Sequence, residues 1–147
     1  MSSRAYQKAL NYLSRALRTT AEVRQYLSRN GFSNEEIEEV ISKLTAIGYL
    51  DDRRYLENYL LSEKALRYGI NKIKFKLLQK GIDLEHLNNL PVDEEEEVNK
   101  AKEILLKKYK QLDPMDYGKY YRFLVGRGFS PAVARKAVFL TDDKDNG

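Results

Sequence analysis

The segment VRQYLSRNGFSNEEIEEV, residues 23–40, decides the fold because it contains a complete helix–glycine–helix step. Val23 and Leu27 are about one helical turn apart, and the apolar residues from Ile37 onward follow the period of an amphipathic helix. Gly31 lies between the two stretches and can adopt the positive φ that ends a helix. The spacing therefore predicts two short helices that meet at a glycine.

The residues that begin these helices can also be identified. Ser33 and Glu36 have the spacing of a capping box, in which each side chain accepts a hydrogen bond from the backbone N–H of the other residue. Thr19 and Glu22 repeat this pattern upstream. We therefore expect helices to begin directly after Thr19 and Ser33.

Two later segments repeat the pattern: IKFKLLQKGIDLEHLNNL at 73–90 and YYRFLVGRGFSPAVARKA at 120–137. Aligned on Gly31, Gly81 and Gly128, the three segments place apolar residues at the same offsets. The glycines lie 50 and 47 residues apart, a period typical of helical repeats. The sequence therefore predicts one structural unit used three times.

The helix starts of the later units follow the same logic. Asp83, and Ser130 followed by Pro131, occupy the place of Ser33 and favour helix initiation. The stretch 73–77 alternates apolar and polar residues, which is typical of a strand. The repeat register favours a helix there.

A further amphipathic stretch precedes each step, so each unit is predicted to contain three helices and the all-α chain roughly nine. The residues that mark these stretches are Ala9, Leu13, Ala16 and Leu17; Tyr55, Tyr59 and Leu66; and Val98, Ala101, Leu105 and Tyr109. The predicted tandem three-helix repeats occupy residues 4–50, 51–90 and 93–140, and a disordered acidic tail follows at 141–147.

Composition excludes several classes of protein. The 147 residues are 42% hydrophobic and 33% charged, as expected of a folded chain. The absence of cysteine excludes a disulfide framework, a thiol nucleophile and cysteine-ligated zinc, and the single histidine, His86, excludes polyhistidine metal sites. The first ten residues lack the apolar region of a secretory signal, and no apolar run could span a bilayer. We expect a soluble, cytoplasmic protein.

No catalytic motif is present: the sequence contains no Walker A loop, GxSxG, HExxH or dinucleotide fingerprint. The acidic run 93–97 could bind a metal, but acid at a helix N-terminus explains it more simply. His86 is interpreted as a surface or capping side chain. We therefore expect no enzymatic activity, no metal and no cofactor.

The basic residues are clustered, although the net charge is only +4 and the pI about 9.1. Two stretches, 67–80 and 119–136, contain cations and no acid. Lys72, Lys76 and Lys80 are spaced to share one helical face, where like charges repel. A solvated helix face and a surface for an acidic partner or DNA explain this spacing equally well. Arg29, Lys80 and Arg127 lie just before the turn glycines, and the helix dipole is the favoured explanation of that placement.

Two other features could indicate nucleic-acid binding. The helix–glycine–helix step could be a DNA-reading helix-turn-helix, but a packing corner is favoured because the helix after Gly31 carries several carboxylates that phosphates would repel. The 11 tyrosines could stack on bases, but most occupy helix-periodic apolar positions. We interpret them as core or amphipathic surface residues.

Four motifs over about residues 5–140 resemble the RecX family, the regulators of the RecA recombinase. The motifs are RTxxEVxxxL at 18–27 followed by Gly31-Phe32, GYLDDxRY at 48–55, GxxKIxxxLxxKGI at 69–82, and FLxxRGFS at 123–130. GYLDD with the basic–aromatic pair after it is the most specific motif. Ile70 departs from the proline common in the family, and Ala134 from its usual larger aliphatic residue.

We expect GYLDD to have a structural role. Gly48 would end a helix, and Tyr49 and Leu50 would fill the core between repeats. Asp51 or Asp52 would cap the next helix.

The resemblance implies an elongated, curved array of three-helix repeats that binds in the groove of the RecA–single-stranded DNA filament and bridges neighbouring protomers. It implies inhibition of ATP hydrolysis, strand exchange and repressor co-cleavage. It also implies weak binding to single-stranded or double-stranded DNA. We expect the protein to act as a monomer.

The candidate contact residues would pair electrostatically with RecA carboxylates or DNA phosphates. They are Arg67, Lys72, Lys76, Lys80, Arg122, Arg127, Arg135 and Lys136, with Arg15, Arg18 and Arg24 as further candidates. One alternative is a general DNA-binding helical protein that competes with RecA for single-stranded DNA, which the low net charge disfavours. Another is an α-repeat adaptor for a different protein partner.

Overall fold

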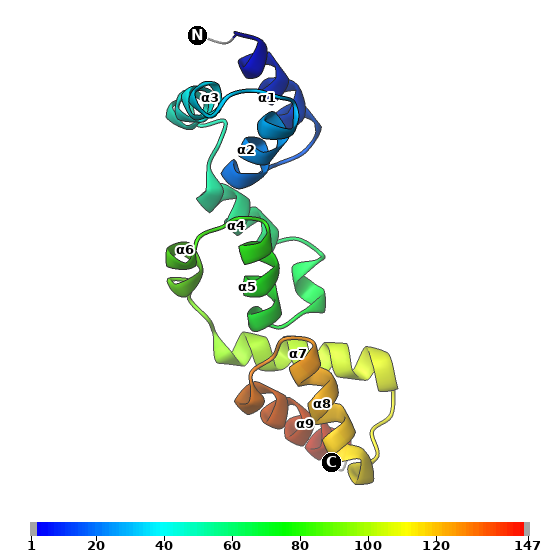
Figure 1. Ribbon diagram of the computed structural model, residues 1–147. Coiled ribbons are helices and arrows are strands. Elements are labelled where there is room, and N and C mark those ends of the chain that lie inside the picture. The colour runs from blue at the N-terminus through cyan, green and yellow to red at the C-terminus, as the bar shows by residue number, and fades with distance from the viewer. Residues whose placement is uncertain (1–2, 146–147) are drawn as a thin grey trace. The chain divides into compact units, whose positions relative to one another are not determined.

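The structure is a computed structural model that describes residues 3–145, with side chains described through residue 141 (Figure 1). Within this range the chain forms nine α-helices and two 3-10 helices and contains no strand, which confirms the all-α prediction. The α-helices are α1 (Ser3–Arg15), α2 (Thr20–Arg29), α3 (Asn34–Ala46), α4 (Asp52–Leu60), α5 (Ile70–Gln79), α6 (Leu84–Asn88), α7 (Glu94–Tyr109), α8 (Tyr117–Gly126) and α9 (Pro131–Asp145). The 3-10 helices are η1 (Ala65–Arg67) and η2 (Pro114–Asp116).

The chain folds into two compact units, and each is discontinuous in sequence. Unit 1 contains residues 3–60 and 77–88, and unit 2 contains residues 61–76 and 89–145. The boundary between them falls within α5. The three sequence repeats and their limits stay a prediction.

Unit 1 has its core where α1, α2 and α3 pack together. Its buried residues are Ala5, Ala9, Val23, Leu27, Ile37, Val40, Ile41, Leu44 and Leu50. Both predicted capping boxes are present: Thr19 accepts from the backbone N–H of Glu22, and Ser33 accepts from that of Glu36. The corner between α2 and α3 is the predicted glycine, since Gly31 has a φ of 86°.

Unit 2 has its core among α7, α8 and α9. Its buried residues are Val98, Ala101, Leu105, Tyr120, Leu124, Phe129, Val133, Ala134, Ala137 and Val138. Ser130 accepts from the backbone N–H of Val133, with Pro131 as the first helical residue, as predicted. The segment 73–77 lies within α5, so the repeat register was the correct guide there.

The prediction of a disordered tail at 141–147 is wrong for its first part. Helix α9 continues to Asp145, because Thr141 is only 2% exposed and its hydroxyl donates to the Ala137 carbonyl at 2.7 Å. Thr141 also lies one turn after Ala137 on the buried face of the helix. Residues 146 and 147 are outside the described range.

Two predicted helices are shorter than their apolar patterns suggested. Helix α1 ends at Arg15, so Ala16 and Leu17 lie beyond it, and Leu17 is 51% exposed. Helix α4 ends at Leu60, and Leu66 belongs to η1. In both cases the last apolar residue of the pattern is exposed rather than packed in the core.

The GYLDD segment is structural, with one correction. Gly48 has a φ of 81° and follows α3, and Leu50 is buried in the core of unit 1. Tyr49 is 57% exposed, so it does not fill a core. Asp51 caps α4 by accepting from the backbone N–H groups of two residues in its first turn. Asp52 instead accepts from the backbone N–H of Thr20 at 2.8 Å.

None of the described helices is both long and apolar enough to cross a membrane.

Candidate partner-binding surface

Three cations of unit 2 surround the ring of Tyr68. The ammonium groups of Lys76 and Lys72 lie 4.0 and 5.2 Å from the ring centroid, and the Arg127 guanidinium lies 5.7 Å from it. Lys72 and Lys76 come from α5, whereas Arg127 is the C-cap residue that directly follows α8. The cluster therefore joins residues about 50 to 60 positions apart in the sequence. We call these four residues the Tyr68 cluster.

A backbone contact holds the Tyr68 cluster together. The N–H of Gly69 donates to the Arg127 carbonyl at 2.9 Å, and the N–H of Asn71 donates to the Gly128 carbonyl at 3.0 Å. A Cβ on Gly69 would lie 2.5 Å from the carbonyl carbon of Gly128, so only glycine permits this approach. The start of α5 is thus fixed against the corner between α8 and α9.

A buried carboxylate secures the same helix start. Glu97 of α7 is 7% exposed and accepts from the backbone N–H of Ile70 at 2.9 Å. Its other oxygen pairs with Lys100 at 2.9 Å, and Lys100 also donates to the Ala65 carbonyl at 3.5 Å. This carboxylate connects α7 to the segment before and at the start of α5.

Glu97 differs from its acidic neighbours. The sequence interpretation of 93–97 as acid at a helix N-terminus holds for Asp93, which caps α7 by accepting from the Glu96 N–H. It misses Glu97, whose buried carboxylate instead binds the Ile70 N–H and the Lys100 ammonium group.

The cations lower the pKa of the Tyr68 phenol. The largest cause is its hydrogen bond with Lys76, followed by the charge of that ammonium group, and Lys72 and Arg127 act in the same direction. Burial acts in the opposite direction and ranks after the two effects of Lys76 but before the charges of Lys72 and Arg127. The site therefore favours negative charge, as expected of a surface that receives an anionic partner.

Beside the Tyr68 cluster, unit 2 contains a hollow of about 520 Å³, which we call the basic hollow. Its lining has an apolar part, which we call the floor, and a charged part of four cations and one carboxylate, which we call the rim. The floor residues are Leu66, Ile104 and Phe123, and the rim residues are Glu63, Arg67, Lys107, Lys108 and Arg127.

Arg127 is common to the hollow and the cluster. Its Nη1 donates to the Arg67 carbonyl at 3.2 Å, and its guanidinium lies 5.2 Å from the centroid of the Phe123 ring. The Lys108 ammonium lies 5.4 Å from the same centroid. One arginine therefore takes part in both sites and is held in place by a backbone carbonyl.

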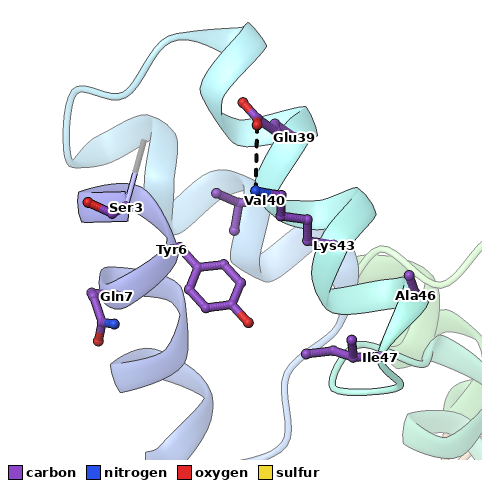
Figure 2. A pocket seen from close by; sticks show the side chains of 8 residues that line it. All are labelled: Ser3, Tyr6, Gln7, Glu39, Val40, Lys43, Ala46 and Ile47. Atoms are coloured by element: carbon purple, nitrogen blue, oxygen red, sulfur yellow. Dashed lines mark ion pairs between the residues drawn. The ribbon is translucent and has the colours of Figure 1, made fainter. Parts of the chain in front are cut away.

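Unit 1 contains a hollow of different character, of about 490 Å³, between α1 and α3 (Figure 2). Figure 2 shows the Tyr6 ring directed into the space between the two helices. The charged residues Glu39 and Lys43 pair with each other at 3.6 Å. The full lining is Ser3, Tyr6, Gln7, Glu39, Val40, Lys43, Ala46 and Ile47.

The predicted contact residues separate into groups. Arg67, Lys72, Lys76 and Arg127 are brought together in unit 2 by the Tyr68 cluster and the basic hollow. Lys80 belongs to unit 1, where its ammonium lies 3.7 Å from Glu22 and its carbonyl accepts from the Thr19 hydroxyl at 2.6 Å.

The remaining predicted contacts are scattered. Lys136 pairs with Glu94, and Arg24 donates twice to Glu38 at 2.7 and 3.2 Å. The Arg18 guanidinium lies 4.3 Å from the centroid of Tyr12. Exposed positions on α1, α8 and α9 hold Arg15, Arg122 and Arg135.

Sequence reasoning did not identify the other residues of this surface, among them Tyr68, Lys107, Lys108 and Phe123. The two lysines are adjacent at the C-terminal end of α7, where the helix dipole explains them without a partner. The signal that could have found Tyr68 is its position directly after Arg67, at the start of an acid-free stretch. Phe123 belongs to the FLxxRGFS motif at 123–130, but nothing in this motif indicates that lysine and arginine side chains lie over its ring.

Comparisons with known proteins agree with this architecture. Residues 5–44 match the family model of the first three-helix domain of RecX, and residues 94–138 match that of the third. The chain belongs to the RecX family. Curated RecX proteins with the name "Regulatory protein RecX" align over most of the chain.

One such RecX protein, from Clostridium tetani, is 36% identical over 82% of this chain and 59% of its own length. Another, from Thermus thermophilus, is 34% identical over 100% of this chain and 99% of its own. The crystal structure of RecX from Lactobacillus salivarius superposes with a TM-score of 0.83 at 28% identity, covering 95% of this chain and 96% of that one. The match to the third RecX domain includes Lys107, Lys108, Phe123 and Arg127 of the basic hollow.

Proposed function

We propose that this RecX-family chain is a negative modulator of the RecA recombinase that works without catalysis. It binds in the groove of the RecA–single-stranded DNA filament and inhibits ATP hydrolysis, strand exchange and co-protease activity. The observation that carries the proposal is the Tyr68 cluster, in which three cations are held around one ring by backbone contacts between distant segments.

The arrangement suits an anionic partner. The cations of the Tyr68 cluster face an aromatic ring rather than a carboxylate, so their positive charge is not neutralised locally. Long-range attraction to acidic groups then steers association and sets its orientation. RecA carboxylates or filament DNA phosphates would supply the negative charge.

The predicted contact set is accordingly reordered. Arg67, Lys72, Lys76 and Arg127 form its centre. Lys80, Lys136 and Arg24 contribute less, because each has a carboxylate within its own unit. Further, peripheral contacts are Arg15, Arg18, Arg122 and Arg135. The protein acts as a cytoplasmic monomer of three repeats and binds DNA alone only weakly.

The test is single-stranded-DNA-dependent ATP hydrolysis by RecA from the same organism, titrated with the wild-type chain and with Lys72→Glu/Lys76→Glu. We expect the wild type to inhibit below one chain per RecA protomer and the double variant to need at least about tenfold more protein, since two attractive contacts become repulsive. Circular dichroism checks that the variant is folded.

A matched control distinguishes the effect of changing this surface from the effect of changing the net charge of the protein. Arg4→Glu/Lys8→Glu makes the same change at the same four-residue spacing on α1, and it should inhibit like the wild type. Equal loss in both variants would show that only net charge matters. Inhibition that appears only when the chain saturates the DNA would favour the alternative, a general DNA-binding protein that competes for the strand.

A further inference from the structure

We propose that the basic hollow of unit 2 binds an acidic segment of a partner protein, with an apolar side chain placed in the hollow and neighbouring carboxylates pairing with its rim. This inference rests on the proposed function, because it assigns the hollow to RecA protomers rather than to filament DNA. It concerns residues that the Tyr68 cluster does not use, chiefly Leu66, Lys107 and Lys108.

The floor of the hollow is suited to binding an apolar side chain. Leu66 is 63% exposed although it is a large aliphatic residue, and it lines the same cavity as Ile104 and Phe123. A leucine-sized or phenylalanine-sized side chain fits within the cavity of about 520 Å³ and would remove part of this apolar surface from water. Such an anchor in a pocket is the usual centre of a protein–protein contact.

The rim of the hollow attracts negatively charged groups. Arg67, Lys107, Lys108 and Arg127 oppose the single carboxylate of Glu63 around the opening. Lys107 and Lys108 project from the last turn of α7, and Arg127 is oriented by its hydrogen bond to the Arg67 carbonyl. A guanidinium held in this way is suited to a carboxylate, with which it forms two parallel hydrogen bonds.

The aromatic rings favour a protein over a nucleic acid. Single-stranded nucleic acids bind by stacking bases on aromatic faces. Here the cationic groups of Lys108 and Arg127 lie over the Phe123 ring. The three cations of the Tyr68 cluster lie over the Tyr68 ring. Cations therefore already occupy the positions over both rings. A phosphodiester backbone also has no apolar side chain to place on the floor. An acidic peptide satisfies both the floor and the rim.

The experiment is photo-crosslinking from the floor. The variant Leu66→p-benzoylphenylalanine is bound to RecA filaments on single-stranded DNA and irradiated, and the crosslinked products are identified by mass spectrometry. Met115→p-benzoylphenylalanine is the matched control, because Met115 is 89% exposed and lies outside the hollow. We expect the first variant, and not the second, to crosslink to a RecA peptide that contains both carboxylates and an apolar residue.

Two results would overturn the proposal while leaving the proposed function intact. One is crosslinking of position 66 to DNA. The other is the absence of any crosslink although the variant inhibits RecA like the wild type. In parallel, Lys107→Glu/Lys108→Glu should weaken filament binding about tenfold and Leu66→Ser severalfold, whereas Met115→Ser should have no effect.

A peptide titration distinguishes failure of the hollow from failure of the proposed function. The probe is acetyl-Glu-Glu-Leu-Phe-Glu-Glu-amide, and its control replaces the leucine and phenylalanine with serine. We expect the first peptide to shift the NMR signals of Leu66, Lys107 and Lys108, and to do so more strongly than the control or oligo-dT. If the wild type does not inhibit RecA but this selectivity is present, the hollow stands and its partner is another protein. If oligo-dT is preferred, the hollow is not a peptide site.

Discussion

The positively charged side chains of the two units have different kinds of neighbour. In unit 1, Arg24, Lys43 and Lys80 each lie within 4 Å of a carboxylate. In unit 2, Lys72, Lys76, Lys108, Lys119 and Arg127 lie over aromatic rings instead. An ion pair cancels charge, whereas an aromatic ring orients a cation and leaves its charge in place. The contrast teaches that the distribution of partners, rather than the net charge of +4, distinguishes the proposed binding surface from other basic positions.

The contrast has exceptions that define its limits. Unit 1 contains Arg18 over the Tyr12 ring, and unit 2 contains the ion pairs of Glu97 with Lys100 and of Glu94 with Lys136. The Glu97 pair is buried and structural, whereas the Tyr68 cluster is at the surface. Carboxylates of unit 2 thus stabilise the frame that presents its cations.

The largest difference should come from removing one carboxylate in each unit. Glu97→Ala should destabilise the protein by about 3 kcal/mol, since it leaves Lys100 and the Ile70 N–H without their buried partner. Glu38→Ala should have little effect on stability, because both members of its pair with Arg24 are about half exposed and water screens their attraction. Urea unfolding measures both changes, and similar values for the two variants would refute the distinction.

The next effect tests the frame around Tyr68. Gly69→Ala places a methyl group 2.5 Å from the Gly128 backbone and should cost about 2 kcal/mol. Gly31→Ala in unit 1 meets no atom within 4 Å and has only the strain of its positive φ, about 1 kcal/mol. Thermal unfolding compares the two. Only the variant at position 69 should also weaken RecA inhibition, because only it moves the start of α5 away from Arg127.

A smaller effect concerns the cap of α2. The Thr19 hydroxyl accepts from the Glu22 N–H and donates to the Lys80 carbonyl, so Thr19→Ala removes two contacts of a buried side chain. We expect a loss of about 1.5 kcal/mol. Ser33→Ala, at an exposed cap of the same type, should cost about 1 kcal/mol or less. Chemical denaturation of both variants would contradict this order if Ser33→Ala were the more damaging.

The smallest effect is spectroscopic and compares one tyrosine from each unit. Cations lower the pKa of Tyr68, whereas burial, followed by nearby Glu22, raises that of Tyr55. On raising the pH, the phenolate absorbance of Tyr68 should therefore appear below the usual value of about 10, and that of Tyr55 above it. Ultraviolet titrations of Tyr68→Phe and Tyr55→Phe should lack the earliest and a late transition, respectively.

The same shifts have opposite consequences for stability. The folded state favours the charged form of Tyr68, so this phenol adds stability as the pH rises through its lowered folded-state pKa. Tyr55 favours its neutral form and loses stabilising effect once the pH exceeds its unfolded-state pKa. A Tyr68→Phe variant that loses no alkaline stability relative to the wild type would contradict this assignment.

Local features were predictable from sequence because they depend on neighbours. The caps at Thr19 and Ser33 and the glycine corner at Gly31 require only residues within a few positions. The exposure of Leu17, Leu66 and Tyr49 was not predictable, because an apolar pattern can extend past the point where the core ends.

The proposed binding surface was only partly predictable, because its residues are distant in the sequence. The acid-free stretches identified Lys72, Lys76 and Arg127, but not which side chains lie together. That arrangement depends on backbone contacts between 69–71 and 127–128, which no local spacing encodes. Lys80 shows the converse, since it shares the helical spacing of Lys72 and Lys76 and yet belongs to the other unit.

The discontinuity of the two units has a consequence for synthesis on the ribosome. Unit 1 needs residues 77–88 to complete its packing. The Thr19 hydroxyl cannot donate its hydrogen bond to the Lys80 carbonyl until Lys80 has been synthesised. The intervening residues 61–76 cannot find their own partners until residues 89–145 have emerged. In a nascent chain the Tyr68 region therefore lacks its unit 2 partners while unit 1 can already pack. The cations of the proposed binding surface come together only after residues 127 and 128 have emerged to meet residues 69–71.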